Sequence, residues 1–197
     1  MTFRLGLTGS IGMGKSTTAA MFAAEGLPVW DADAVVRQLY VKGGQATAIV
    51  ATLFPEAIED AAVSRPKLRA LIAKDPTVLD RIQAVVHPLV AQNRAEFLQN
   101  CTADMAVLDI PLLYETGADA GCDAVVVVTA PADVQRARVL ARGEMTEPEF
   151  DLILVRQMPD AAKRARADYI IETTSLDGAR NSVRAICADI RERLAHA

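Results

Sequence analysis

Short apolar runs alternate with amphipathic segments along most of the chain. Five runs have the length and composition of strands: Phe3–Thr8, Pro28–Trp30, Met105–Leu108, Ala124–Val128 and Tyr169–Ile171. Between the first two, Lys15–Glu25 carries apolar residues at helical spacing and stops at Gly26, a favourable residue just past a helix end. Continuous apolar strands separated by helices indicate a parallel sheet that is buried on both faces. The pattern therefore predicts a doubly wound α/β fold with a five-stranded parallel sheet.

Two long intervals depart from this alternation. Residues 34–100 contain no convincing strand, and we interpret them as a helical insertion. Its pattern is interrupted at Gly43-Gly44, Pro55, Pro66, Pro76 and Pro88. Residues 133–166 are also helical in pattern and rich in arginine, and we expect them to form a mobile lid. Because no repeat or linker separates these parts, we predict one domain over residues 1–197.

Charge and cysteine content exclude several classes of protein. A net charge of -4 lacks the basic excess that a nucleic-acid footprint needs, so no nucleic-acid partner is expected. The three cysteines, Cys101, Cys122 and Cys187, are widely spaced, which favours buried reduced thiols over disulfides or a zinc site. No apolar run reaches the roughly 18 residues of a membrane span, and no signal peptide precedes the first strand. We expect a cytoplasmic protein with no membrane or evident protein partner.

The segment after the first strand carries the clearest chemistry. Gly9-Ser10-Ile11-Gly12-Met13-Gly14-Lys15-Ser16 matches G-x-x-x-x-G-K-[ST], between an expected strand and an expected helix. In such a P-loop, backbone N–H groups converge on phosphate oxygens, and the helix that follows presents the positive end of its dipole. Lys15 would reach the β- and γ-phosphates, and the Ser16 hydroxyl would ligate Mg²⁺. We therefore predict a nucleotide-binding loop over residues 9–17, which ends at Thr17.

Two missing motifs narrow the choice of nucleotide. The dinucleotide fingerprint G-x-G-x-x-G fails because Thr17 stands where its third glycine should be. The Asn/Thr-Lys-x-Asp signature of guanine-specific proteins also has no match in a suitable place. The sequence therefore disfavours a nicotinamide cofactor and favours ATP, with Mg²⁺, over GTP.

Acidic residues follow two expected strands at their carboxyl ends, where open α/β sheets bind ligands. Asp33, in Asp31-Ala32-Asp33, follows the second strand, which we expect beside the first strand and its loop. Its carboxylate is placed to accept the proton of an attacking hydroxyl, and the alternative for Asp33, as for Asp31, is a helix cap. Asp109 ends the third strand, where an acidic residue commonly helps to hold Mg²⁺ through water or caps the next turn.

Two lid arginines differ from the other basic residues of residues 133–166. Arg138 and Arg142 are four apart, so we expect them on one helical face, where they could converge on a transferring phosphoryl group. The other basic residues fit a solvated helix face. We predict Lys15, Asp33 and Arg142 as catalytic residues and Arg138 as a nucleotide contact.

Taken together, these and further segments resemble the dephospho-coenzyme A kinase family over nearly the whole chain. The resemblance rests on Gly6–Ser16, Asp31–Asp33, Val86–Val90, Leu108–Glu115, Gln135–Arg142, Gln157–Pro159 with Lys163, and Ala167–Ile171. It implies ATP-dependent phosphorylation of the ribose 3′-hydroxyl of dephospho-CoA, with Asp33 beside that hydroxyl and the helical insertion gripping the substrate. The sequence departs from the family pattern at Pro55, at Asp60-Ala61-Ala62, at Gly143-Glu144 and at Thr173.

The residues alone leave two other functions open. Another small-molecule kinase, such as a nucleoside monophosphate kinase, would share the loop and the lid. A non-catalytic ATP-binding switch would share the loop alone. Only the dependence of ATP turnover on an acceptor distinguishes the three.

Overall fold

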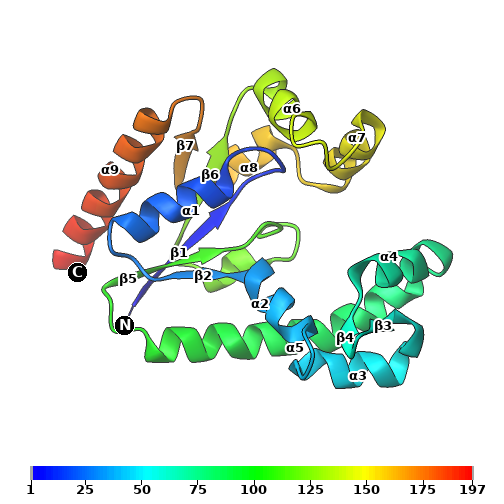
Figure 1. Ribbon diagram of the computed structural model, residues 1–197. Helices are drawn as coiled ribbons and strands as arrows, with labels where there is room; N and C mark the ends of the chain where they lie inside the picture. The colour runs from blue at the N-terminus through cyan, green and yellow to red at the C-terminus, as the bar shows by residue number, and fades with distance from the viewer. Residues whose placement is uncertain (1, 197) are drawn as a thin grey trace. The chain divides into compact units, whose positions relative to one another are not determined.

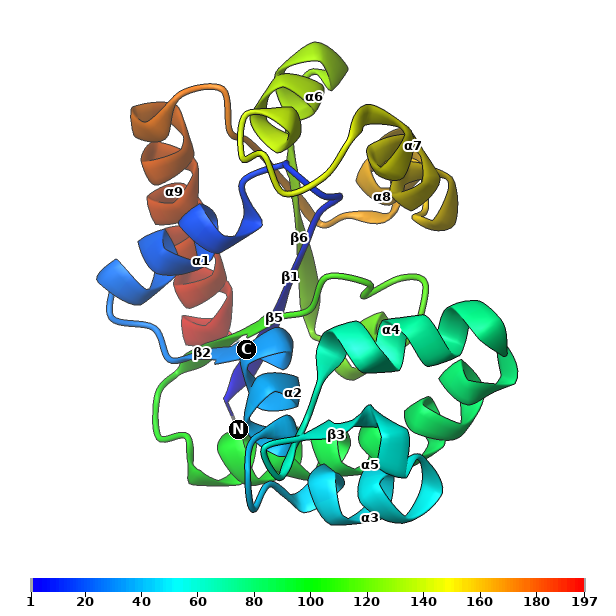
Figure 2. The same cartoon turned by 45° about the vertical axis from the view of Figure 1, so that its right-hand side comes forward.

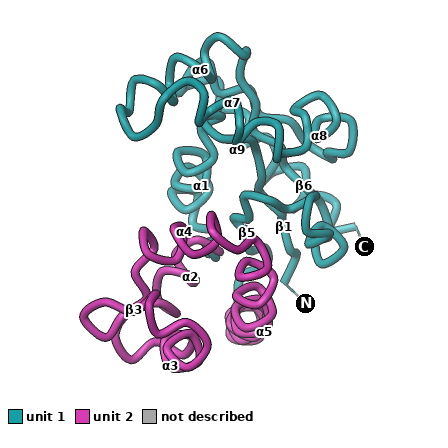
Figure 3. The backbone as a smooth tube through the Cα atoms, turned by 90° about the vertical axis from the view of Figure 1, so that its right-hand side faces the viewer, with its two compact units in different colours: residues 1–30, 101–197 teal, residues 31–100 magenta. Residues whose placement is uncertain are grey.

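The computed structural model describes residues 2–196, in which strands and helices alternate along the chain (Figure 1). These residues form two compact units, which Figure 3 shows in different colours. The first unit comprises the described residues up to Trp30 and from Cys101 onward, and the second comprises residues 31–100.

A five-stranded sheet contains the strands that the apolar runs predicted. Its members are β1 (Phe3–Thr8), β2 (Val29–Asp31), β5 (Met105–Asp109), β6 (Ala124–Thr129) and β7 (Tyr169–Glu172), in the order β2-β5-β1-β6-β7. β1 pairs in parallel with β5 and β6, and β6 in parallel with β7. Leu5, Leu7 and Val126 are fully buried, as expected of strands covered on both faces. The predicted doubly wound α/β fold is confirmed.

The order of the strands corrects one expectation. β2 does not lie beside β1, because β5 lies between them in a register that runs from Phe3↔Met105 to Leu7↔Asp109. Chain order cannot reveal this arrangement, since a crossover connection can return a strand to either side of its predecessor. Of the two strands expected to lead into acidic residues, the one next to β1 and its loop is therefore β5, which ends at Asp109.

Helices pack on this sheet and extend beyond it. They are α1 (Lys15–Ala24), α6 (Ala132–Leu140), α7 (Glu147–Arg156), α8 (Asp160–Arg166) and α9 (Leu176–Ala195), with a short 3₁₀ helix at Ala118–Gly121. α1 and α9 lie side by side in both views (Figures 1 and 2), and Phe22 and Ile190 from these helices are fully buried in the core. α6, α7 and α8 fall within residues 132–166, so the predicted helical character of this interval is confirmed.

The second unit is mostly helical, as predicted. Its elements are α2 (Ala32–Tyr40), α3 (Gln45–Leu53), a 3₁₀ helix (Pro55–Ala57), β3 (Ile58–Glu59), β4 (Ala62–Val63), α4 (Arg65–Lys74) and α5 (Thr77–Asn100). The interruptions expected at Gly43-Gly44, Pro55, Pro66 and Pro76 fall between these elements or within their first turns. Proline is tolerated there because the first N–H groups of a helix have no intrahelical partner.

Two local expectations for this unit are wrong. Pro88 lies inside α5, a helix of 24 residues that does not end at the proline. The backbone hydrogen bond that proline removes is outweighed by the packing of Val78, Ile82 and Val86, which this helix buries. The antiparallel pair β3–β4 was not expected either. Its turn uses Asp60 and Ala61 at φ 49° and 63°, left-handed conformations that glycine or asparagine usually signals.

The cysteines and the helices bear on two further expectations. Among the described residues no cysteine forms a disulfide; Cys187 is buried, whereas Cys101 and Cys122 are partly exposed. Among the helices of residues 2–196, none combines the length and the apolar character needed to cross a bilayer.

Candidate active site

The phosphate loop joins β1 to α1 with backbone geometry that requires glycine at defined points. Gly14 precedes α1 at φ 90°, in the left-handed region where a side chain is strained. At Gly9, a Cβ atom would lie 2.3 Å from Cγ2 of Val128 on β6. The loop is closed internally by hydrogen bonds from Met13 N to Ser10 O (3.1 Å) and from Thr18 N to Gly14 O (3.0 Å). The predicted motif thus has the strand, turn and helix that it needs.

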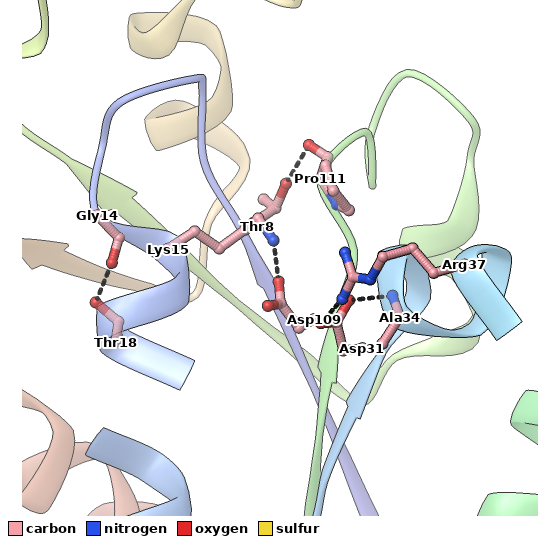
Figure 4. Close-up of polar contacts among 9 residues, drawn as sticks. All are labelled: Thr8, Gly14, Lys15, Thr18, Asp31, Ala34, Arg37, Asp109 and Pro111. Carbon is pink, nitrogen blue, oxygen red and sulfur yellow. Dashed lines mark hydrogen bonds and ion pairs between the residues drawn. The ribbon is translucent and has the colours of Figure 1, made fainter. Parts of the chain in front are cut away.

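Lys15 and Asp109, predicted from segments far apart in the sequence, meet directly. The Lys15 Nζ atom forms an ion pair with Oδ1 of Asp109 (Figure 4). Only 14% of the lysine side chain and 5% of the aspartate side chain are exposed. Asp109 reaches this position because it ends β5, next to Leu7 of β1. The ammonium group of Lys15 therefore contacts a nearly buried carboxylate.

A cavity of about 310 Å³ opens beside the loop. Its lining includes Gly12, Gly14, Thr17, Arg138, Arg142 and Thr173. The structure therefore brings five predicted residues together with Thr173, which the sequence marked only as a departure from the family pattern. Of the other predicted loop residues, Gly9, Ser10 and Met13 are buried, Ile11 is half-buried, and Ser16 is exposed in the first turn of α1.

The two lid arginines reach the cavity in a different way from the one predicted. α6 ends at Leu140, and Arg142 lies in the turn beyond it, where its N–H donates to Val139 O. Arg138 and Arg142 are therefore not on one helical face, although both line the cavity. The helix ends early because Gly143 follows in the left-handed region, at φ 67°.

Two glutamines that were not predicted form hydrogen bonds with the backbone of Ile11 in the phosphate loop. Gln135 Nε2 donates to Ile11 O at 2.7 Å, and Ile11 N donates to Gln157 Oε1 at 3.1 Å. Gln135 belongs to α6 and Gln157 directly follows α7. Both glutamines begin segments that carry the family resemblance, which was the available signal, but neither belongs to a motif with a known chemical role.

A buried ion pair contacts Met158, the residue that follows Gln157. Lys163 is completely buried, and its Nζ atom lies 2.8 Å from Oε1 of Glu115, which also accepts a hydrogen bond from Met158 N at 2.8 Å. Burial raises the pKa of the Glu115 carboxyl, but the hydrogen bonds from Lys163 and Met158 N lower it more, so the pKa lies below its ordinary value. The pair ties the segment after β5 to α8.

Asp31, the last residue of β2, and Asp33 differ in their contacts. Asp31 is the N-cap of α2: its Oδ1 atom accepts from Ala34 N at 2.9 Å, and its Oδ2 atom pairs with Arg37 at 3.4 Å (Figure 4). Asp33 lies in the first helical turn with an exposed side chain. The helix-cap interpretation therefore holds for Asp31 and is wrong for Asp33.

The oxygen atoms near the loop fit a magnesium ion that takes only one or two ligands from the protein and the rest from water and phosphates. Among the residues that the structure describes, no three His, Cys, Asp or Glu side chains gather into a metal site. Ser16 in the first turn of α1 and Asp109 at the end of β5 offer a hydroxyl and a carboxylate. Mg²⁺ is commonly held by one or two such groups together with water and substrate phosphates.

Comparison with known proteins decides the family. Residues 3–177 match the family model for dephospho-CoA kinase. The chain belongs to the dephospho-CoA kinase family. The dephospho-CoA kinase of Cereibacter sphaeroides is 61% identical over 190 residues, which cover 96% of each chain. That of Ruegeria pomeroyi is 56% identical over 197 residues and covers 100% of both chains.

Solved structures share the fold of this chain. A structure from Thermus thermophilus matches with a TM-score of 0.85 and 34% identity, covering 95% of this chain and 97% of that chain. Dephospho-CoA kinase from Campylobacter jejuni matches with a TM-score of 0.66 and 18% identity, over 96% and 97% of the two chains, which shows the fold alone. Membership of the dephospho-CoA kinase family makes this protein an ATP-using kinase with a small-molecule substrate, and so confirms the predicted family and enzyme class.

Proposed function

We propose that the protein transfers the γ-phosphoryl group of ATP to the ribose 3′-hydroxyl of dephospho-CoA, giving CoA and ADP in the last step of coenzyme A synthesis. The observation that carries the proposal is the phosphate loop with its Lys15–Asp109 pair, in a chain that belongs to the dephospho-CoA kinase family. The three cysteines, none of them in a disulfide among the described residues, fit an enzyme of the reducing cytoplasm.

The nucleotide occupies the loop and the cavity beside it. Backbone N–H groups of residues 9–17 and the N-terminus of α1 bind the phosphates. Lys15 leaves Asp109 and moves to the β- and γ-phosphates, because two phosphate groups offer it more negative charge than one carboxylate. Arg138 and Arg142, which line the cavity, contact the nucleotide, and Arg142 neutralises charge on the transferring group.

Ser16 and Asp109 would hold Mg²⁺, Ser16 through its hydroxyl and Asp109 through water. When bound, the ion neutralises negative charge on the phosphate oxygens.

Asp33 serves the acceptor. Its exposed carboxylate takes the proton of the 3′-hydroxyl as the hydroxyl oxygen bonds to the γ-phosphorus and the bond to the β-phosphate oxygen breaks. The helical insertion of residues 34–100 binds dephospho-CoA. The lid of residues 133–166 closes over both ligands and excludes water, which would otherwise accept the phosphoryl group.

Acceptor dependence tests this proposal. ATP turnover is measured in a coupled ADP-release assay with Mg²⁺ and, in turn, dephospho-CoA, a nucleoside monophosphate or no acceptor. We expect turnover to rise steeply with dephospho-CoA alone, with CoA formed in equal amount to ADP. A steep rise with the monophosphate instead would replace the acceptor, and acceptor-independent turnover would refute transfer altogether.

A further inference from the structure

Thr173 directly follows β7 and lies where three segments of the first unit meet. Only 9% of the residue is exposed. Its hydroxyl oxygen lies 2.8 Å from Met13 O in the phosphate loop and 3.2 Å from Thr129 O at the end of β6. The same oxygen accepts a hydrogen bond of 2.9 Å from Nη1 of Arg138 on α6. A single side chain therefore joins the loop, the sheet and the lid interval.

The donors and acceptors at this hydroxyl can be assigned. A threonine hydroxyl has one proton to donate and lone pairs to accept with. Arg138 can only donate, so it takes a lone pair and leaves the proton for a carbonyl. Met13 O is the nearer acceptor, and Thr129 O already accepts from Thr173 N at 2.9 Å. The proton therefore serves the phosphate loop.

The guanidinium of Arg138 is held at two points by this one residue. Nη1 donates to the hydroxyl, and Nη2 donates to Thr173 O at 2.6 Å. The pair of bonds fixes the plane of the guanidinium beside the cavity that Arg138 lines. With the hydroxyl removed, the carbonyl alone would leave the guanidinium free to swing about one bond.

The side chain also packs against the start of α1. A Cβ atom at Gly14 would lie 3.1 to 3.3 Å from three atoms of Thr173, so the loop backbone passes close to this side chain. Met13 and Gly14 are the two residues immediately before Lys15. The shape of the loop at the lysine therefore depends on what occupies position 173.

We propose that Thr173 is a positioning residue for the nucleotide: its hydroxyl holds Arg138 and the Met13 carbonyl together, and so orders the cavity before ATP arrives. This role rests on the proposed nucleotide site but not on the identity of the acceptor. Its effect follows from preorganisation, because an arginine that is already fixed loses less conformational freedom when the ligand binds.

The test measures the Kd of ATP by calorimetry, with Mg²⁺ and without dephospho-CoA. Thr173→Val keeps the shape of the side chain and removes the hydroxyl, and should raise the Kd about tenfold, the order expected from losing one hydrogen bond to a charged group. Thr173→Ser keeps the hydroxyl and should bind ATP within threefold of the parent. Thr174→Val is the control, because its exposed hydroxyl contacts only Glu172 among the described residues; it should bind like the parent.

A double-mutant cycle separates positioning from simple structural damage. Arg138→Met removes the guanidinium, so adding Thr173→Val to it should weaken ATP binding by a smaller factor than in the parent. An unchanged factor would overturn the role through Arg138. A Thr173→Val protein within threefold of the parent, or a Thr173→Ser protein as weak as Thr173→Val, would overturn the role of the hydroxyl.

Two further measurements, of folding and of transfer activity, make the Kd values interpretable. Circular dichroism and thermal melting check the fold, and if Thr173→Val does not fold, Thr173→Cys, whose thiol is a weak hydrogen-bonding group, replaces it with the same expected rise in Kd. A parent protein that binds ATP but transfers nothing to dephospho-CoA would refute the proposed reaction and leave the role of Thr173 to be decided by the Kd values.

Discussion

Replacing Asp33 with asparagine removes one charge and preserves size, so its effects on stability and on chemistry can be compared. Asp31, and not Asp33, caps α2, so the helix keeps its first hydrogen bond. The lost interaction of an exposed carboxylate with the helix dipole costs about 0.3–1 kcal/mol. Over a chain of this length that shifts Tm by roughly 1–4 °C. Loss of a general base lowers kcat by roughly 10²–10⁴-fold, or about 2.7–5.5 kcal/mol of activation free energy.

The assay is CoA formation at saturating ATP and dephospho-CoA, with ATP affinity and Tm measured on the same preparations. Asp31→Asn is the matched control, because it removes the same charge two residues earlier and asparagine also caps helices well. We expect Asp33→Asn to lose kcat by at least about a hundredfold with ATP affinity nearly unchanged, and Asp31→Asn to keep most of its activity. Near-full transfer by Asp33→Asn, or equal losses in both variants, would refute the role of Asp33 as base.

Three further perturbations test the site. Lys15→Ala should weaken ATP binding or turnover by orders of magnitude in a folded protein, and unchanged turnover would contradict the loop assignment. Hydrogen exchange in residues 133–166 should slow when ATP and dephospho-CoA are added together, and an unaltered exchange rate would argue against a closing lid. Lys163→Met should cost about 3 kcal/mol in urea unfolding, because it leaves Glu115 without its buried partner. The pKa of Glu115 is lowered in the folded state, so its ionised form stabilises the fold above the unfolded-state pKa, and this stability is lost as the pH falls through the folded-state pKa. The difference in unfolding free energy between parent and variant should therefore narrow below about pH 4. A difference that stays constant with pH would exclude this linkage.

Features that depend on neighbours in the sequence were predicted well. β1 has the predicted bounds, and α1 begins at the predicted Lys15 and ends one residue early. The loop between them follows from glycine spacing, because each special backbone position needs the absence of a side chain there. The pairing of Lys15 with Asp109 was not predicted, because it depends on β5 lying beside β1.

Features that depend on distant partners were missed. The position of β5 between β2 and β1 is a property of pairing across about a hundred residues, which no local pattern records. Thr173 acts on backbone carbonyls, and any residue supplies those, so its sequence context carries no trace of its partners. Its signals were its place just after β7, at the same edge of the sheet as the loop, and its departure from the family pattern. The turn at Asp60 and Ala61 escaped detection because its left-handed backbone is built without glycine.

The ion pair between Lys15 and Asp109 should make the phosphate loop selective among anions. An incoming anion must displace a carboxylate that is already desolvated, at a site where the two side chains are only 14% and 5% exposed. A chloride or a single inorganic phosphate makes few contacts that could offset the cost of displacing Asp109 from Lys15. A triphosphate also accepts hydrogen bonds from the backbone N–H groups along the loop. We therefore expect the loop to bind common small anions weakly, and Lys15 to become available mainly to ligands that carry several phosphate groups.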